Sequence, residues 1–230
     1  GAVERIAQQA ASFMVAGFVH GVLNSDNINV TGESFDYGPW RFNPNWDPRF
    51  TAAYFDHQGL YAFGRQAEAM HWNLAQLAIS LRLISEAPPL VEALERFPAL
   101  FQAAIVNRFL WRLGVASKGS ETDRALVEAG ERAMIDAAIP IADFFHYHRG
   151  GMLPDRGYEG ERYSAFTEIL SQFEPAASTT STYWAEHAPC SMLIEEVEAI
   201  WQAIASDDDW MPLSRKIEAV RQFGAALRNR

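Results

Sequence analysis

The stretch from His20 to Trp40, HGVLNSDNINVTGESFDYGPW, concentrates the polar side chains with which this chain could do chemistry. It holds two aspartates, Asp26 and Asp36, and three asparagines around the dipeptide Thr31-Gly32. Carboxylate and amide oxygens are the ligands that hard cations such as Mg²⁺ prefer, and a carboxylate can also accept a proton. The stretch is therefore a candidate metal-binding and acid–base site.

The middle of this stretch predicts a β-hairpin. Short strand-like runs at residues 28–30 and 33–35 flank a two-residue connection whose second residue is glycine. A two-residue turn pairs Asn27 with Asp36, and facing side chains in such a ladder are about 4.5 to 5.5 Å apart at Cβ. We therefore predict that Asn27 and Asp36 hold one Mg²⁺ (or Mn²⁺) and that Asp26, beside them, accepts a proton. An ordinary asparagine-rich turn explains the same residues without an ion, and that alternative stays open.

The composition predicts a compact folded chain that binds neither nucleic acid nor a membrane surface. With 230 residues, 49% of them hydrophobic, the chain can bury one sizeable core or two small ones. Its net charge of -10 opposes attraction to phosphate backbones and anionic lipids, so we expect no nucleic-acid and no membrane partner. Cys190 is the only cysteine, which excludes an internal disulfide and indicates a reducing compartment, the cytoplasm.

Apolar periodicity predicts a mainly helical fold. A first helix begins within the first residues and ends near Phe18, and a clear stripe runs from Ala67 to Leu81 until Pro88-Pro89 terminates the helix. Further helices are expected at residues 90–97, 99–113, 124–139, 164–173, 192–205 and 213–227. Because the sequence lacks an initial Met and starts inside a helical pattern, we expect a fragment of a longer protein.

Three other groups of polar residues favour structural roles. His146 and His148 would diverge on a helix, so a metal site there is not favoured. His20, at the end of the first helix, is interpreted as a scaffold residue whose ring bonds to nearby backbone. The run Asp207-Asp208-Asp209 is interpreted as a helix cap in preference to a cation site.

A series of motifs follows one another in the order known from an enzyme family. They are HGVLNSDN, DYGPW, DPRF, a Gln-Gly-x-Tyr-x-Phe element at residues 58–63, Gln66, and Trp72-Asn73-Leu74 leading into a helix. This series resembles the selenoprotein O family, also called SelO or YdiU, clearly from about Val3 to Leu83 and more faintly as far as Phe145. The His loop, hairpin and Asp-aromatic-Gly triplet are also similar to the catalytic segment of kinases, but Val22 stands where kinases carry their catalytic aspartate.

The resemblance implies a protein-kinase-like C-lobe with one small β-hairpin carrying the metal site and with the N-lobe absent. Residues 1–150 would form the kinase-like core, with the catalytic loop and hairpin at 20–38, and residues 151–230 a helical extension packed on it. The implied activity is that of a pseudokinase that binds ATP in a flipped orientation and transfers AMP to hydroxyls of protein substrates. By position, Asp26 is similar to the proton acceptor of the family, Asn27 and Asp36 to its Mg²⁺ ligands, and Asp36 also lies near the nucleotide.

Two other functions stay open from the sequence. One is a kinase-like phosphotransferase, and the other is a non-catalytic helical interaction module. The family's N-lobe, with its glycine-rich segment and nucleotide-binding lysine, has no match in this chain. We therefore expect the chain alone to bind ATP poorly and to be inactive, and the intact protein to be the enzyme.

Overall fold

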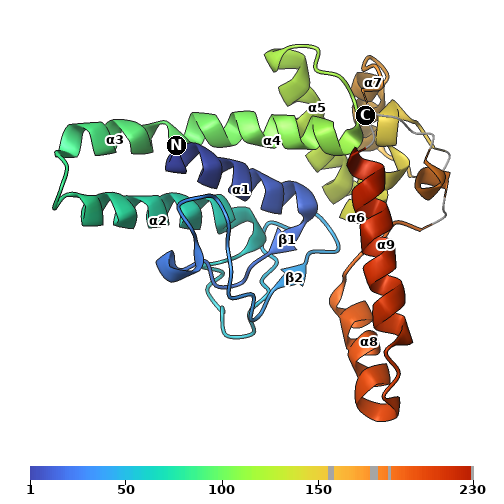
Figure 1. Ribbon diagram of the computed structural model, residues 1–230. Helices are drawn as coiled ribbons and strands as arrows, with labels where there is room; N and C mark the ends of the chain where they lie inside the picture. The colour runs from blue at the N-terminus through green and yellow to red at the C-terminus, as the bar shows by residue number, and fades with distance from the viewer. Residues whose placement is uncertain (155–157, 177–180, 186–187, 229–230) are drawn as a thin grey trace. The chain divides into compact units, whose positions relative to one another are not determined.

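The computed structural model describes residues 1–154, 158–176, 181–185 and 188–228, and these are mostly α-helical (Figure 1). The helices are α1 (Ala2–Ala16), α2 (Gln66–Leu81), α3 (Ala87–Glu95), α4 (Phe97–Leu113), α5 (Ser120–Asp136), α6 (Ile141–Tyr147), α7 (Glu161–Leu170), α8 (Ile194–Asp207) and α9 (Met211–Arg228). The predicted mainly helical fold is confirmed. Within the described ranges, no helix is long and apolar enough to cross a membrane.

The chain divides into two compact units by its internal contacts. The first comprises residues 1–43 and 47–108, and the second residues 44–46 and 109–230. The stretch from His20 to Trp40, called the site segment from here on, lies in the first unit. The division into a kinase-like core of residues 1–150 and an extension of residues 151–230 stays a prediction. Parts of that extension, residues 155–157, 177–180, 186–187 and 229–230, lie outside the described residues.

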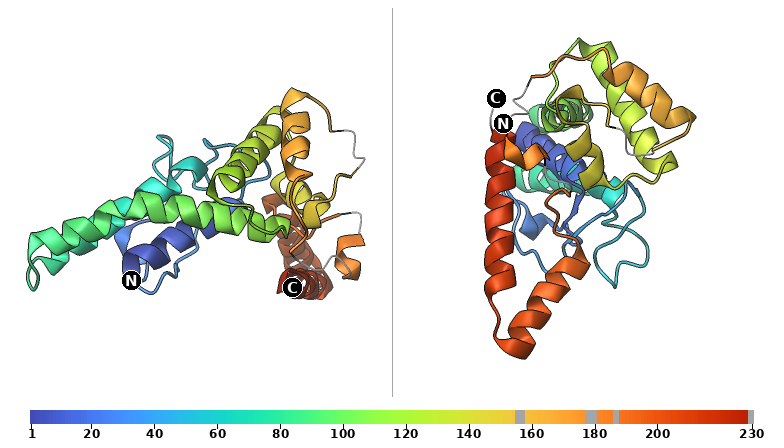
Figure 2. Two further views of the ribbon diagram at one scale, coloured as in Figure 1. Left: turned by 90° about the horizontal axis from the view of Figure 1, so that it is seen from above. Right: turned by 90° about the vertical axis from the view of Figure 1, so that its right-hand side faces the viewer.

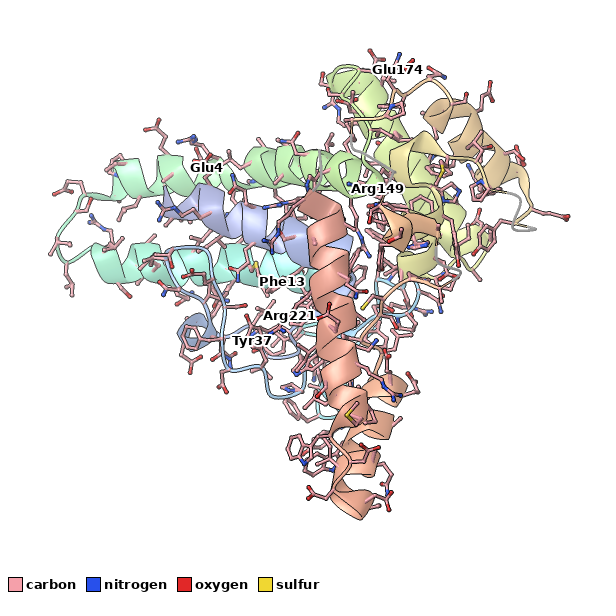
Figure 3. The ribbon with its side chains drawn as sticks, turned by 45° about the vertical axis from the view of Figure 1, so that its right-hand side comes forward. Glu4, Phe13, Tyr37, Arg149, Glu174 and Arg221 are labelled. Carbon is pink, nitrogen blue, oxygen red and sulfur yellow. The ribbon has the colours of Figure 1, made fainter. Side chains whose placement is uncertain are left out.

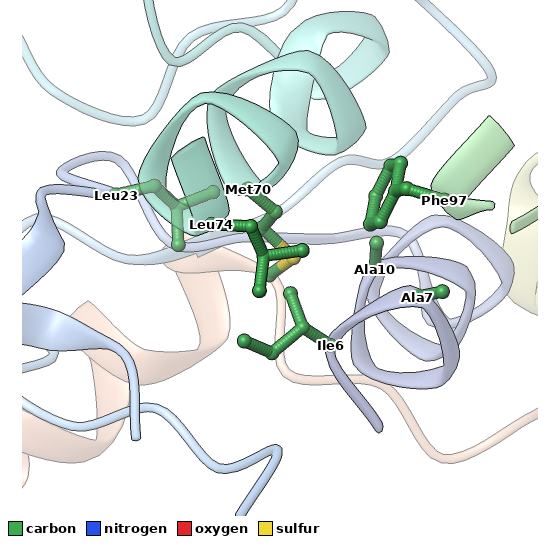
Figure 4. Packing of buried hydrophobic residues seen from close by; sticks show 7 residues of the cluster. All are labelled: Ile6, Ala7, Ala10, Leu23, Met70, Leu74 and Phe97. Atoms are coloured by element: carbon green, nitrogen blue, oxygen red, sulfur yellow. The ribbon is translucent and has the colours of Figure 1, made fainter. Parts of the chain in front are cut away.

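The core of the first unit forms where α1 packs against α2 (Figure 1). Its buried cluster consists of Ile6, Ala7, Ala10, Leu23, Met70, Leu74 and Phe97 (Figure 4). Leu23 belongs to the site segment and is 1% exposed. Burial of a leucine side chain contributes about 1.5 to 3 kcal/mol, so Leu23 fastens the site segment to the helices.

The antiparallel strands β1 (Phe18–Val19) and β2 (Arg41–Phe42) come directly before and directly after the site segment in the sequence. Phe18 pairs with Phe42, and their ring centroids are 5.4 Å apart. Gly17, with a φ of +72°, ends α1, and its carbonyl accepts a hydrogen bond from the N–H of Asn43 at 2.7 Å. This short pair therefore brings the two ends of residues 20–40 together.

The prolines at positions 88 and 89 begin a helix instead of ending one. α2 ends at Leu81, and α3 starts at Ala87, so both prolines lie in the first turn of α3. At that position the missing N–H has no intrahelical partner to lose. The prediction that this pair terminates the preceding helix is wrong.

The second unit contains the helix pair α5 and α7 (Figure 2). Phe144 on α6 is fully buried, with its ring centroid 4.8 Å from that of Phe166 on α7. At the start of α9, the Asp209 carboxylate accepts a hydrogen bond from the N–H of Met211 at 2.9 Å. The predicted capping role of the acidic run is confirmed for Asp209 but is wrong for the other two residues, because Asp207 is the last residue of α8 and Asp208 is its C-cap.

His148 is fully buried, and both of its ring nitrogens have partners in the second unit. Nδ1 donates to the carbonyl oxygen of Phe144 at 2.8 Å, and Nε2 accepts from the hydroxyl of Tyr163 at 3.0 Å. Burial lowers the pKa of His148 to about 4. The imidazole is therefore neutral, and neither nitrogen is open to a metal ion.

We predict that His148 makes the chain less stable in mild acid. Because its folded pKa of about 4 lies below the unfolded value of 6.5, the unfolded chain takes up the extra proton, and stability falls as the pH drops from 6.5 toward 4. The full effect is about 3 kcal/mol. In urea unfolding at about pH 7 and about pH 4.5, His148→Gln should lose this pH dependence, while exposed His57→Gln should keep it. Equal pH dependence in wild type and His148→Gln would contradict the prediction.

Candidate active site

His20 opens the site segment directly after β1 and is fully buried. Its Nε2 lies 2.9 Å from the carbonyl oxygen of Phe35, and the N–H of Val22 donates to its Nδ1 at 3.4 Å. A carbonyl oxygen only accepts, so Nε2 carries a proton. Because Nδ1 accepts from the N–H of Val22, it carries no proton, and the ring is neutral. Burial is the main cause that lowers the pKa of His20, while the Phe35 carbonyl and the charge of Asp36 oppose it. The predicted scaffold role of the ring is confirmed.

Gln66 clamps the start of the site segment from the first turn of α2. Its side chain is fully buried. Nε2 donates to the carbonyl oxygen of Phe18 at 2.8 Å, and Oε1 accepts from the N–H of His20 at 3.1 Å. One amide therefore satisfies two backbone groups of the strand that leads into the site.

Asp26 and Asn27 lie on a single 3₁₀ turn, η1 (Ser25–Asn27). Asp26 is exposed, whereas Asn27 is 5% exposed, and its Nδ2 donates to the carbonyl oxygen of Val22 at 2.8 Å. This bond fixes the amide plane and leaves the oxygen Oδ1 as the atom of the amide that a cation could contact. Asn73 of α2 holds the same loop, because its Nδ2 donates to the carbonyl oxygen of Leu23 at 2.7 Å.

The predicted two-residue hairpin turn is wrong, because the loop has three residues. The N–H of Asn29 donates to the carbonyl oxygen of Glu33 at 2.7 Å, and that of Gly32 donates to the carbonyl oxygen of Asn29 at 3.0 Å. Gly32 has a φ of +86°. A glycine in this left-handed conformation closes the usual three-residue hairpin loop. Residues 30–32 therefore form the turn.

The extra turn residue shifts the register by one position. An isolated bridge joins Ile28 to Ser34, and the N–H of Phe35 donates to the carbonyl oxygen of Asn27 at 3.2 Å. Asn27 therefore faces Phe35, and the predicted pairing of Asn27 with Asp36 is wrong. The regular antiparallel pair of the described chain is β1 with β2, which flanks the site segment instead of carrying it.

Asp36 lies in a tight bend of the backbone. Its φ is +61°, a conformation that aspartate adopts more readily than most residues, and its carbonyl oxygen accepts from the N–H of Gly38 at 2.9 Å. The hydroxyl of Tyr37, which is labelled in Figure 3, donates to the carbonyl oxygen of Ser34 at 2.6 Å. The ring centroid of Tyr37 is 5.2 Å from that of His20. These contacts fix the bend from which the exposed Asp36 side chain starts.

Tyr61 is a site neighbour whose role the sequence does not reveal, although it belongs to one of the motifs. Its hydroxyl donates to Oδ1 of Asn24, two residues before Asp26. Its N–H donates to Oδ2 of Asp56 at 2.8 Å. Burial, then the charges of Asp56 and Asp26, raise the pKa of Tyr61. Residues far apart in the sequence thus meet at the loop that carries Asp26.

The predicted donors, one amide and one carboxylate, are of the chemical kind that a cation with mostly water and phosphate ligands uses. Among the residues described, no group of three or more His, Cys, Asp or Glu side chains could hold a metal ion. Mg²⁺ often takes only one or two protein oxygens and completes its shell with water and phosphate. Asn27 offers an oriented amide oxygen and Asp36 an exposed carboxylate. Phe35 links them, since it bonds to the backbone of Asn27 and directly precedes Asp36.

The sequence matches a family model described as "Protein adenylyltransferase SelO" over residues 1–154. The chain belongs to the SelO family. Relatives named "Protein nucleotidyltransferase YdiU" include one from Synechocystis sp., 34% identical over 95% of this chain and 50% of the relative, and one from Gloeobacter violaceus, 32% identical over 96% and 49%. One from Pseudomonas putida is 37% identical over 62% of this chain and 29% of the relative. The chain spans about half the length of the first two SelO relatives.

Removal of the Gln66 clamp should destabilise the folded chain. Gln66→Met keeps much of the side-chain volume but leaves the His20 N–H and the Phe18 carbonyl without their partner. We expect a loss of about 2 to 3 kcal/mol in the free energy of unfolding, measured by urea denaturation. Gln76→Met on the same helix, at a half-buried position, is the matched control and should cost under about 0.5 kcal/mol. A loss of similar size in both variants would contradict the clamp.

Proposed function

We propose that the intact protein is a SelO-type protein adenylyltransferase that transfers AMP from ATP to Ser, Thr or Tyr hydroxyls of proteins. The observation that carries the proposal is the family match over residues 1–154, a range that includes Asp26, Asn27 and Asp36. The local architecture supports it, because buried neutral groups hold the loop while both carboxylates stay exposed. The kinase-like C-lobe and the cytoplasm as the site of action belong to the same proposal.

Asp26 is proposed as the general base. It would accept the proton of the acceptor hydroxyl as that oxygen bonds to the α-phosphorus of ATP, while the bond to pyrophosphate breaks. Asn27 and Asp36 would hold Mg²⁺ (or Mn²⁺), and Asp36 would also lie near the nucleotide. The ion, when bound, offsets the negative charge of the phosphates.

Isotope position in ATP separates adenylylation from phosphorylation. The intact protein, incubated with Mg²⁺, an acceptor protein and either α- or γ-labelled ATP, should leave label on protein only from the α position. Label from the γ position alone would support a kinase-like phosphotransferase and contradict the proposal. The chain of 230 residues by itself should transfer neither label.

Substitution of the two carboxylates should affect different steps. In the intact protein, Asp26→Ala should lower kcat of AMP transfer by about 10² to 10⁴-fold and leave ATP affinity within about twofold. Asp36→Ala should weaken Mg²⁺-dependent ATP binding, measured by calorimetry. Glu33→Ala, an exposed carboxylate of the same loop, is the matched control and should change neither quantity. Full transfer by Asp26→Ala would refute the base, and unchanged biological activity of Asp36→Ala would favour a non-catalytic interaction module.

A further inference from the structure

Tyr61 reaches the loop of Asp26 from a distant part of the sequence. Its hydroxyl donates to Oδ1 of Asn24, the residue at the N-terminal cap position of η1. The ring packs against the buried cluster around Leu23, and the N–H is held by Oδ2 of Asp56 at 2.8 Å. The backbone, ring and hydroxyl of Tyr61 are therefore all fixed.

Asn24 is placed where an asparagine ordinarily caps its own helix. The side chain of a cap residue normally accepts a hydrogen bond from the backbone N–H two or three residues later, here that of Asp26 or Asn27. Asn24 makes no such side-chain bond. The N–H of Asn27 donates to the backbone oxygen of Asn24 at 3.0 Å, while Oδ1 of Asn24 is bound by Tyr61. The tyrosine hydroxyl thus keeps the Asn24 side chain out of its usual cap.

We propose that Tyr61 is a positioning residue for Asp26, because its hydrogen bond to Asn24 holds η1 in the conformation that presents the Asp26 carboxylate to the acceptor hydroxyl. The inference rests on the proposed adenylyltransferase function. Tyr61 acts through Asn24 and makes no contact with the reacting atoms. Without the hydroxyl, Oδ1 of Asn24 is free to turn toward the backbone of η1 and to shift the turn that carries Asp26.

The environment of Tyr61 keeps its hydroxyl a donor. Burial and the charges of Asp56 and Asp26 raise its pKa, so the phenol stays protonated through neutral pH. The effect of the Asp26 charge on the pKa of Tyr61 also agrees with the proximity of the two side chains. A change in the orientation of a catalytic carboxylate mainly raises the free energy of the transition state. We therefore expect it to lower kcat.

Tyr61→Phe in the intact protein tests the inference, because it removes only the hydroxyl and keeps the packed ring. We expect kcat of AMP transfer to fall by about 10- to 100-fold, with KM for ATP within about twofold and thermal unfolding nearly unchanged. Tyr163→Phe is the matched control, since it removes the hydrogen bond to His148 in the second unit and should leave kcat unchanged. Unchanged kcat in Tyr61→Phe, or equal losses in both variants, would overturn the inference.

Asn24→Ala breaks the same hydrogen bond from its other end. Tyr61→Phe should therefore add little to the loss of kcat in an Asn24→Ala background, whereas multiplied losses would overturn the inference. The variant also tests the contact if Tyr61→Phe fails to fold. Normal transfer by wild type with no effect of either substitution would remove the role of Tyr61 and leave the proposed function intact. Absence of transfer by the wild-type protein would instead remove the proposed function and this inference with it.

Discussion

The arrangement of the site depends on two hydrogen bonds made by the backbone N–H and the backbone carbonyl of Phe35. The N–H of Phe35 donates to the carbonyl oxygen of Asn27 at 3.2 Å, and its carbonyl oxygen accepts from Nε2 of His20 at 2.9 Å. This residue therefore connects the start of the segment, the η1 turn and the bend at Asp36. The additional hydrogen bond from the N–H of Val22 requires a neutral His20, because a charged ring would lose Nδ1 as its acceptor. Burial of the ring lowers its pKa and keeps it in that form.

The sequence indicates where the site segment lies, but not how its residues pair. Thr31-Gly32 correctly marks a reversal of the chain, because glycine adopts a positive φ without steric cost. Glycine is common as the last residue of both two-residue and three-residue hairpin loops, so the sequence alone does not determine the loop length. A change of one residue moves every facing pair, and that is why Asn27 lies opposite Phe35 and not opposite Asp36. The roles of Gln66 and Tyr61 depend on long-range contacts, which no local pattern reveals.

Periodicity predicts the long helices because each has one apolar face and one polar face. The predicted stripe from Ala67 to Leu81 corresponds to α2, which ends at Leu81. α6 escapes such prediction because its seven residues, IADFFHY, are largely buried and show no stripe. β1 and β2 have two residues each, too few for any alternation to appear. Pro88 and Pro89 show a further limit, since proline is compatible both with the end of one helix and with the first turn of the next.

Charge and burial divide the work of the site between two classes of side chain. The groups that set its shape are neutral and buried, namely the imidazole of His20 and the amides of Asn27, Gln66 and Asn73. Asp26 and Asp36, which would do the chemistry, are exposed. Water weakens the attraction between such carboxylates and a cation, and exclusion of water strengthens it several-fold. Tight binding of a metal nucleotide therefore requires further protein surface over these carboxylates. The SelO relatives from Synechocystis sp. and Gloeobacter violaceus are about twice as long as the region that this chain matches.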